Sequence, residues 1–391
     1  MRLHLQETCC VNFMKNCLLA LCLSFIGLAN AQSDQHVVFG EWPQYFKEED
    51  KLVRVFLDKN GHYYPTTIIA QDKLLEHNAA LQDYYAANEQ AFISVAKTYH
   101  LEVSGYSEET FMLLQDQIVS QLAASINRLP ATDDLFLLIH GFRKPMLSQR
   151  GGSSSARDYA AVRERIDQQY ADIQASASFI EVYWDGTYDC CIGRKTKVNK
   201  RIFTLFEEVA QVNASRVGYG LRQLVAVLDR EELNIVTHSL GAQVGLSLLT
   251  NAYDDRIDLR AQAWPTPPQP TVNVCLVAPA IARKPFEEYH ERSTALDFAK
   301  TDNYRLHILY NEQDFVLKKR WKIFGPGPKK YGDTSLGCNC HNEAEKLANQ
   351  FEEDFPHSAL ILHESKIGGT HRFIRYVSSA AFASFLQAVN E

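Results

Sequence analysis

The chain has 391 residues, of which 46% are hydrophobic and 22% are charged, as in an ordinary globular protein. This composition excludes a disordered, collagen-like or coiled-coil protein, and the length suits one large domain with additions. The formal net charge of −7 argues against general nucleic-acid binding. No apolar run reaches the roughly 18 residues that a membrane-spanning helix requires.

An apolar segment near the N-terminus has the pattern of a secretory signal peptide. Lys15 precedes the apolar run Cys17–Leu28, and the small residues of Ala29-Asn30-Ala31 follow it. The run is too short to span a membrane, and it ends at a small-x-small cleavage pattern. We therefore expect removal of residues 1–31 and export to the periplasm or the extracellular space. The alternative interpretation is a buried N-terminal helix.

The cysteines beyond this segment form two close pairs and one isolated residue. Cys190 and Cys191 are adjacent, Cys338 and Cys340 are separated by one residue, and Cys275 lies in an apolar run. Because disulfides persist in exported proteins, we expect one or two bridges between the pairs, with a connectivity that the sequence does not determine. We expect Cys275 to be a buried free thiol.

Residues 32–130 have their own pattern of predicted elements. Two β-prone runs, Leu52–Leu57 and His62–Ile69, flank an Asn-Gly turn, which predicts a hairpin. Residues 71–128 have helical spacing, and Ser107 with the two glutamates after it predicts a helix start. We therefore expect an N-terminal hairpin and a helical extension before the main domain.

From residue 131 to the end, short apolar runs alternate with helical stretches. The runs are nearly continuous in apolar residues, which is typical of strands buried on both faces. Repeated strand–helix–strand units with long crossovers predict an α/β fold, a mostly parallel sheet with helices on both faces. The predicted strands are residues 135–139, 179–183, 234–237, 272–277, 305–310 and 359–362. The predicted helices include residues 155–174, 202–228 and 242–250.

Ser239 follows the third of these strands in a strand–turn–helix pattern. The sequence Thr237-His238-Ser239-Leu240-Gly241 leads directly into a helix rich in small residues. In a nucleophile elbow, a sharp turn lifts the serine hydroxyl clear of the sheet, and small neighbours let the strand and helix approach closely. We therefore expect Ser239 to be a nucleophile and the N–H of Leu240 to face a developing oxyanion. The alternative is an ordinary serine N-cap.

Other candidate residues follow neighbouring strands, whose carboxyl ends meet at one edge of a parallel sheet. Phe142, after a His-Gly pair at the end of the first strand, is the expected second oxyanion donor. Asp314 follows the fifth strand and is the expected acid, with Glu312 as the alternative. His371 lies in a glycine-rich loop after the last strand and is the expected base, with His363 as the alternative.

Five motifs together resemble those of the α/β-hydrolase superfamily from about residue 133 to the end. They are Leu138–Phe142, Val182–Gly186, Thr237–Gly241, Leu309–Asp314 and Thr370–Arg372. Within the superfamily, the chain is most similar to exported bacterial hydrolases formerly grouped as a domain of unknown function. Trp184-Asp185 stands where that group has a Trp-Pro pair, and Leu240 stands where it has methionine. The resemblance implies an α/β-hydrolase fold with a Ser-His-Asp triad formed by Ser239, His371 and Asp314.

These residues predict an exported serine hydrolase that needs no cofactor or metal. We expect it to cleave a carboxylic ester of a small molecule or lipid through an acyl-enzyme. An esterase or lipase-like activity is favoured over a peptidase by analogy of fold. One alternative is a catalytically inactive binding or scaffolding protein of the cell envelope. Another, weaker alternative is a metal-dependent hydrolase that uses His341, His357 and the Cys338/Cys340 pair.

Residues 318–356 separate the predicted acid from the last predicted strand. This segment is expected to be either a substrate-selecting lid or a surface insertion. Its basic run, Lys318-Lys319-Arg320, is either a solvated face or a contact for an anionic substrate or membrane surface. The sequence determines neither the oligomeric state nor the identity of the substrate.

Overall fold

In the described part of the chain, seven strands form one sheet, and every neighbouring pair runs parallel. Their order in the computed structural model is β1-β3-β2-β4-β5-β6-β7. The strands are β1 (Leu52–Leu57), β2 (Asp134–Ile139), β3 (Ala177–Trp184), β4 (Glu232–His238), β5 (Thr271–Val277), β6 (Tyr304–Tyr310) and β7 (Ala359–Glu364). The predicted α/β fold is therefore confirmed.

The structure describes most of the sheet and its helices but not the N-terminal segment. The described residues are 49–65, 80–142, 154–184, 186, 205–249, 271–283, 286, 304–318, 336–354 and 358–390. The predicted signal segment, residues 1–31, lies outside these ranges.

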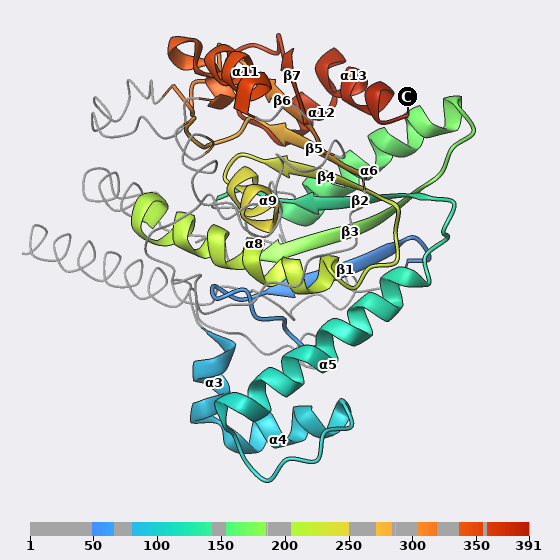
Figure 1. Ribbon diagram of the computed structural model, residues 1–391, viewed down its shortest axis with the longest axis vertical. Coiled ribbons are helices and arrows are strands. Elements are labelled where there is room, and N and C mark those ends of the chain that lie inside the picture. Colours follow the sequence, from blue (N-terminus) through green and yellow to red (C-terminus); the bar gives the residue numbers. More distant parts are fainter. Residues whose placement is uncertain are drawn as a thin grey trace, which may run out of the picture.

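Helices cover both faces of the sheet (Figure 1). On one face α8 packs against α9, and α5 lies against α8 and β1, whereas α6 packs with α12 and α13 on the other face. No helix in these ranges combines the length and apolar character needed to cross a membrane. The helices are α3 (Leu81–Ala87), α4 (Glu89–Thr98), α5 (Glu108–Asn127), α6 (Ser155–Asp172), the π-helix η2 (Leu205–Ala210), α8 (Gln211–Val225), α9 (Gly241–Leu249), α11 (Glu343–Asp354), α12 (Phe373–Val377) and α13 (Ala380–Val389).

The six strands predicted from residue 131 onward all exist, and their burial depends on their place in the sheet. Every residue of β3 is buried, as expected of a strand covered on both faces. β7 differs, because it is the last strand of the sheet and none of its residues is fully buried. Its Ile361 side chain is among the exposed large hydrophobic residues. Burial on both faces was therefore a wrong expectation for β7.

The N-terminal run Leu52–Leu57 makes its main pairing with the central sheet. As β1 it runs parallel to β3, with Leu52 opposite Phe179 and Leu57 opposite Trp184. The expected turn follows it, and Gly61 adopts a φ of +83° there. The return arm of the predicted hairpin consists of a bridge between Leu57 and Tyr63, and residues 66–69 lie outside the described ranges.

Two helix starts follow from their capping serines. Ser107 accepts a hydrogen bond from the backbone N–H of Thr110, whose side chain accepts from the N–H of Ser107 in return. This reciprocal cap fixes the start of α5 at the predicted position. Ser154 caps α6 by accepting from the N–H of Arg157. Residues 151–153, which precede this cap, lie outside the described ranges.

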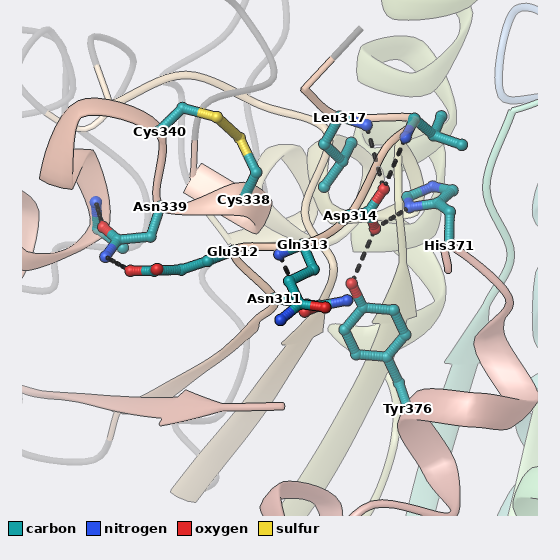
Figure 2. The surroundings of a disulfide bond; sticks show 12 residues. Asn311, Glu312, Gln313, Asp314, Leu317, Cys338, Asn339, Cys340, His371 and Tyr376 are labelled. Carbon is teal, nitrogen blue, oxygen red and sulfur yellow. Dashed lines mark hydrogen bonds and ion pairs between the residues drawn. A yellow bond between two sulfur atoms is a disulfide. The ribbon is translucent and has the colours of Figure 1, made fainter. Parts of the chain in front are cut away.

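The disulfide in the described residues joins Cys338 to Cys340 (Figure 2). We expected bridges from this pair to Cys190 or Cys191. Cys338 and Cys340 instead bond to each other, because they lie two residues apart in one turn. Cys190 and Cys191 lie outside the described residues. Cys275 is free and buried, as predicted.

The described part of the segment 318–356 packs on the sheet rather than standing apart from it. α11 lies against β7, and the turn before it is held by bonds from the N–H of Gly337 to the carbonyl of Pro279 and from the N–H of Asn311 to the carbonyl of Gly337. A Cβ at Gly337 would lie 2.6 Å from backbone atoms of Ala278 and Pro279, so only glycine fits. Residues 319–335 lie outside the described ranges, and the lid expectation therefore remains open for them.

The strand order reverses at β2, which has β3 on one side and β4 on the other. At such a switch point the loops that follow β2 and β4 separate and leave a crevice at the carboxyl edge of the sheet. The His-Gly-Phe sequence follows β2, and Ser239 follows β4. The topology therefore brings two of the predicted site segments together.

Candidate active site

Ser239 stands at a sharp turn between β4 and α9. Its φ is +56°, a left-handed conformation that is costly for a residue with a side chain. Backbone hydrogen bonds hold it there: its N–H donates to the carbonyl of Val277 at 2.9 Å, and its carbonyl accepts from the N–H of Ala280 at 3.0 Å. The end of β5 thus fixes the turn that carries the serine.

Glycines on two elements allow the close packing around this turn. A Cβ at Gly241 would lie 2.6 Å from the carbonyl oxygen of His140. A Cβ at Gly141 would lie 2.8 Å from the Cβ of Ser239. Both separations are too short for real carbon atoms, so the end of β2 and the start of α9 meet only because these residues lack side chains.

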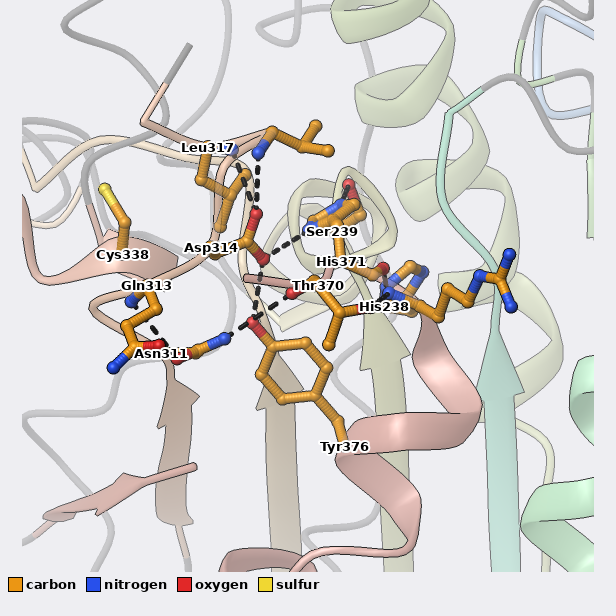
Figure 3. Close-up of polar contacts among 12 residues, drawn as sticks. His238, Ser239, Asn311, Gln313, Asp314, Leu317, Cys338, Thr370, His371 and Tyr376 are labelled. Atoms are coloured by element: carbon orange, nitrogen blue, oxygen red, sulfur yellow. Dashed lines mark hydrogen bonds and ion pairs between the residues drawn. The ribbon is translucent and has the colours of Figure 1, made fainter. Parts of the chain in front are cut away.

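The side chains of Ser239, His371 and Asp314 form a continuous chain of hydrogen bonds (Figure 3). His371 Nε2 lies 2.9 Å from Ser239 Oγ, and His371 Nδ1 lies 2.7 Å from Asp314 Oδ2. The carboxylate can only accept, so Nδ1 carries the proton and Nε2 is free to accept the serine proton. The structure therefore brings together the three residues that the sequence nominated from separate loops.

Asp314 is fully buried and surrounded by donors. Its Oδ1 accepts from the backbone N–H groups of Val316 and Leu317 at 3.0 and 3.1 Å. Its Oδ2 accepts from His371 and from the hydroxyl of Tyr376, which lies 2.8 Å away. Hydrogen bonds of this kind favour the charged form of a carboxyl group.

The alternative acid and base lie elsewhere. The Glu312 carboxylate accepts from the side-chain amide of Asn339, on the side of the acid loop that faces the disulfide (Figure 2). His363 lies within β7, and its Nε2 is 3.0 Å from Nδ1 of His307 on the neighbouring strand. Both side chains are thus bonded away from Ser239, whereas His371 bonds to its hydroxyl.

The segment that carries Phe142 is held by aromatic residues. The His140 N–H donates to the hydroxyl of Tyr159 at 2.7 Å, and its carbonyl accepts from the indole N–H of Trp184 at 2.9 Å. Trp184 also stacks on the His140 ring. These bonds fix the backbone leading to Gly141 and Phe142. Asp185, which follows Trp184 in the second-strand motif, lies outside the described residues.

Two polar side chains hold the loop that carries His371, and neither was predicted from the sequence as part of the site. His238 Nε2 lies 3.1 Å from the carbonyl oxygen of His371, to which it donates. The side-chain amide of Asn311 donates to the carbonyl of Gly368 at 2.7 Å. His238 lies in the motif Thr237–Gly241 and Asn311 in the motif Leu309–Asp314, so membership of these motifs was the available signal.

No group of three or more His, Cys, Asp or Glu residues able to hold a metal ion occurs among the described residues. Two of the ligands in the metal-dependent alternative, Cys338 and Cys340, are bonded to each other. Another, His357, lies outside the described residues. Ser239, His371 and Asp314 all lie within the part of the chain that the structure describes.

Comparison with solved structures gives distant similarities. No family model matches the chain, and no curated protein matches it. The thermophilic esterase Est2 of Thermogutta terrifontis aligns at 11% identity over 67% of this chain and 82% of its own, with a TM-score of 0.32. The same esterase phosphorylated by paraoxon aligns at 12% identity over 67% and 83%, also with a TM-score of 0.32.

An uncharacterized protein from Bacillus cereus is also similar. It aligns at 12% identity over 80% of this chain and 75% of its own, with a TM-score of 0.27. Similarities at this level do not establish an activity. The strand order and helices of this chain define its fold, and the geometry of its site carries the functional proposal.

Proposed function

We propose that this protein is an exported serine hydrolase of the α/β-hydrolase superfamily that cleaves carboxylic esters. The observation that carries the proposal is the continuous relay from Ser239 Oγ through His371 to Asp314, with a serine held at positive φ. A serine N-cap needs neither a histidine on its hydroxyl nor a buried carboxylate behind that histidine.

The first half of the reaction transfers the acyl group to the enzyme. His371 Nε2 takes the proton of Ser239 Oγ as the oxygen attacks the ester carbonyl, and the carbonyl electron pair moves onto its oxygen. The backbone N–H groups of Phe142 and Leu240 are the proposed donors to this oxyanion. The tetrahedral intermediate then collapses, and the carbon–oxygen bond to the leaving group breaks. The alcohol leaves with the proton from His371.

The second half returns the enzyme to its starting state. His371 takes a proton from a water molecule as the water oxygen attacks the acyl-enzyme. A second tetrahedral intermediate collapses, Ser239 Oγ recovers the proton from His371, and the carboxylic acid leaves. Asp314 holds the imidazole orientation and stabilises the imidazolium form in both halves.

A fluorophosphonate probe tests the proposal directly, because it labels only an activated serine. We expect the purified protein to be labelled and to hydrolyse short p-nitrophenyl esters. Ser239→Ala should lose both labelling and hydrolysis.

Ser247→Ala is the matched control. Ser247 is buried in the same helix α9, and its Oγ has no hydrogen-bond partner among the described residues. This variant should keep full labelling. A folded wild-type protein that neither reacts with the probe nor hydrolyses esters would instead support the binding or scaffolding alternative.

Export and substrate type are part of the same proposal. The signal-like residues 1–31 support export, and the substrate we propose is a small-molecule or lipid ester. Cleavage near Ala31 is checked by N-terminal sequencing of the protein secreted by a bacterial host.

A further inference from the structure

Tyr376 contacts the triad from outside the motifs that define it. It lies in α12, four residues before α13 begins, and its side chain is fully buried. Its hydroxyl lies 2.8 Å from Oδ2 of Asp314, the oxygen that also bonds to His371 Nδ1 (Figure 3). We propose that Tyr376 is a positioning residue that fixes the Asp314 carboxylate and sets how strongly that carboxylate stabilises protonated His371. This inference rests on the proposed function.

The two oxygens of Asp314 are held in different ways. Oδ1 is clamped by the N–H groups of Val316 and Leu317, which belong to the same turn as Asp314. These local bonds fix one oxygen but leave the carboxylate able to tilt about it. The Tyr376 hydroxyl comes from a distant helix and holds Oδ2, so it fixes the second point that defines the plane of the carboxylate.

The direction of the Tyr376 hydrogen bond is defined by chemistry. Burial and the adjacent negative charge of Asp314 raise the pKa of Tyr376 far above its usual range, so the phenol remains protonated. The carboxylate has no proton to donate when ionised, and Tyr376 is therefore the donor. Two donors, one phenol and one imidazole, thus share a single carboxylate oxygen.

Sharing this oxygen has a consequence for the base. A donor on Oδ2 takes up part of the negative charge that would otherwise stabilise a protonated imidazole at His371. Removal of the hydroxyl leaves more of that charge for His371 and makes its protonated form more favourable. His238 is a titratable ring beside His371, with ring centroids 4.9 Å apart, and Tyr376→Phe removes no atom that a described contact joins to His238.

The test is Tyr376→Phe, which removes the hydroxyl and keeps the ring. We expect the acid limb of kcat/KM against pH to move to higher pH by about half a unit, since more of the enzyme holds the proton on its base. We expect kcat at the plateau to fall roughly tenfold, with KM nearly unchanged, because the carboxylate plane is less fixed. A residue with only a packing role would lower stability and leave the pH profile in place.

Tyr170→Phe is the matched control. The hydroxyl of Tyr170 donates to Oδ2 of Asp134 at 2.7 Å, which is the same kind of bond at the opposite, amino-terminal end of β2. Its removal should change neither the acid limb nor kcat. A shift of equal size in both variants would overturn the inference.

A second measurement does not depend on turnover. The proton on His371 Nδ1 should give a low-field NMR resonance, identified by its absence in His371→Gln. In Tyr376→Phe this resonance should move downfield as the bond to Asp314 strengthens, and in Tyr170→Phe it should stay in place.

The outcomes separate the two proposals. Wild-type hydrolysis that depends on Ser239, with an unmoved acid limb and an unmoved resonance in Tyr376→Phe, would overturn the role of Tyr376 and leave the proposed function intact. A wild-type protein with no esterase activity and no probe labelling would overturn the proposed function. The resonance alone would then decide whether Tyr376 controls the Asp314–His371 bond.

Discussion

The hydroxyl of Ser239 depends on a backbone conformation that serine rarely adopts. A left-handed residue with a side chain costs roughly 1–2 kcal/mol, and the hydrogen bonds to the end of β5 offset that cost. The conformation points Oγ away from the sheet and toward His371 Nε2. At the scale of single residues, backbone hydrogen bonds therefore hold Ser239 in the conformation that presents its hydroxyl.

The two candidate bases lead to a residue-scale prediction. His371→Gln should lower kcat/KM at least about a thousandfold, because the serine loses its proton acceptor. His363→Gln should change kcat/KM by less than about threefold, because His363 bonds to His307 within the sheet. Steady-state kinetics on a p-nitrophenyl ester measures both. The reverse order of effects would move the base to β7 and refute the triad of Ser239, His371 and Asp314.

At the scale of elements, β6, β7 and α13 bring together a pair of histidines, of which His307 is buried and His363 is half-buried. His307 is fully buried, stacks on His363 and meets the ring edge of Phe385. Burial, with smaller effects from His363 and Arg305, lowers the pKa of His307 to about 3, and burial also lowers the pKa of His363. The pair is stable when neutral, because one ring donates and the other accepts.

These pKa shifts predict acid sensitivity. An unfolded histidine has a pKa of about 6.5, so the unfolded chain binds protons first as the pH falls. Stability is therefore complete above pH 6.5 or so and is lost progressively toward the lower folded pKa. Between pH 7 and pH 5, wild type should lose about 2 kcal/mol more unfolding free energy than His307→Gln. Urea unfolding at the two pH values measures the difference.

His100→Gln is the control for this comparison. His100 is exposed at the end of α4, and its replacement should leave the pH dependence of unfolding as in wild type. Equal pH dependence in His307→Gln and wild type would show that the His307–His363 pair does not contribute.

At the scale of the whole molecule, the N-terminal elements share the core of the main sheet. Buried residues from Leu52 to Val389 belong to one hydrophobic cluster. Val55, Phe56 and Leu57 of β1 are at most 4% exposed, and α5 packs against β1 and α8. Each such side chain contributes about 1.5–3 kcal/mol by burial, against a total stability of roughly 5–15 kcal/mol.

A chain that begins at residue 131 should therefore fail to fold. It would lack β1 and α5 and would expose the edge of β3, which favours aggregation. The control is a chain that begins at residue 48 and keeps every described residue. Solubility, gel filtration and the cooperativity of thermal unfolding compare the two. A soluble, cooperatively folded chain from residue 131 would contradict the shared core.

The sequence by itself determined the features that arise from local chemistry. Buried strands are continuous apolar runs, so β2 to β6 were visible without any tertiary information. Ser107 marks the start of α5 because its cap involves a residue only three positions away. The elbow around Ser239 is likewise local, since strand, turn and helix are adjacent in the chain.

Only the tertiary structure decided the features that depend on distant pairing. The parallel pairing of β1 with β3 joins Leu52 to Phe179, and no local pattern specifies a partner so far along the chain. That His371 rather than His363 bonds to Ser239, and that Asp314 rather than Glu312 bonds to His371, depends on how distant loops meet at the sheet edge. Tyr376 reaches Asp314 from a helix 62 residues later. Hydrogen bonds between distant segments form only when the sheet has brought the carboxyl ends of its strands together. The sequence pattern of one segment contains no signal for them.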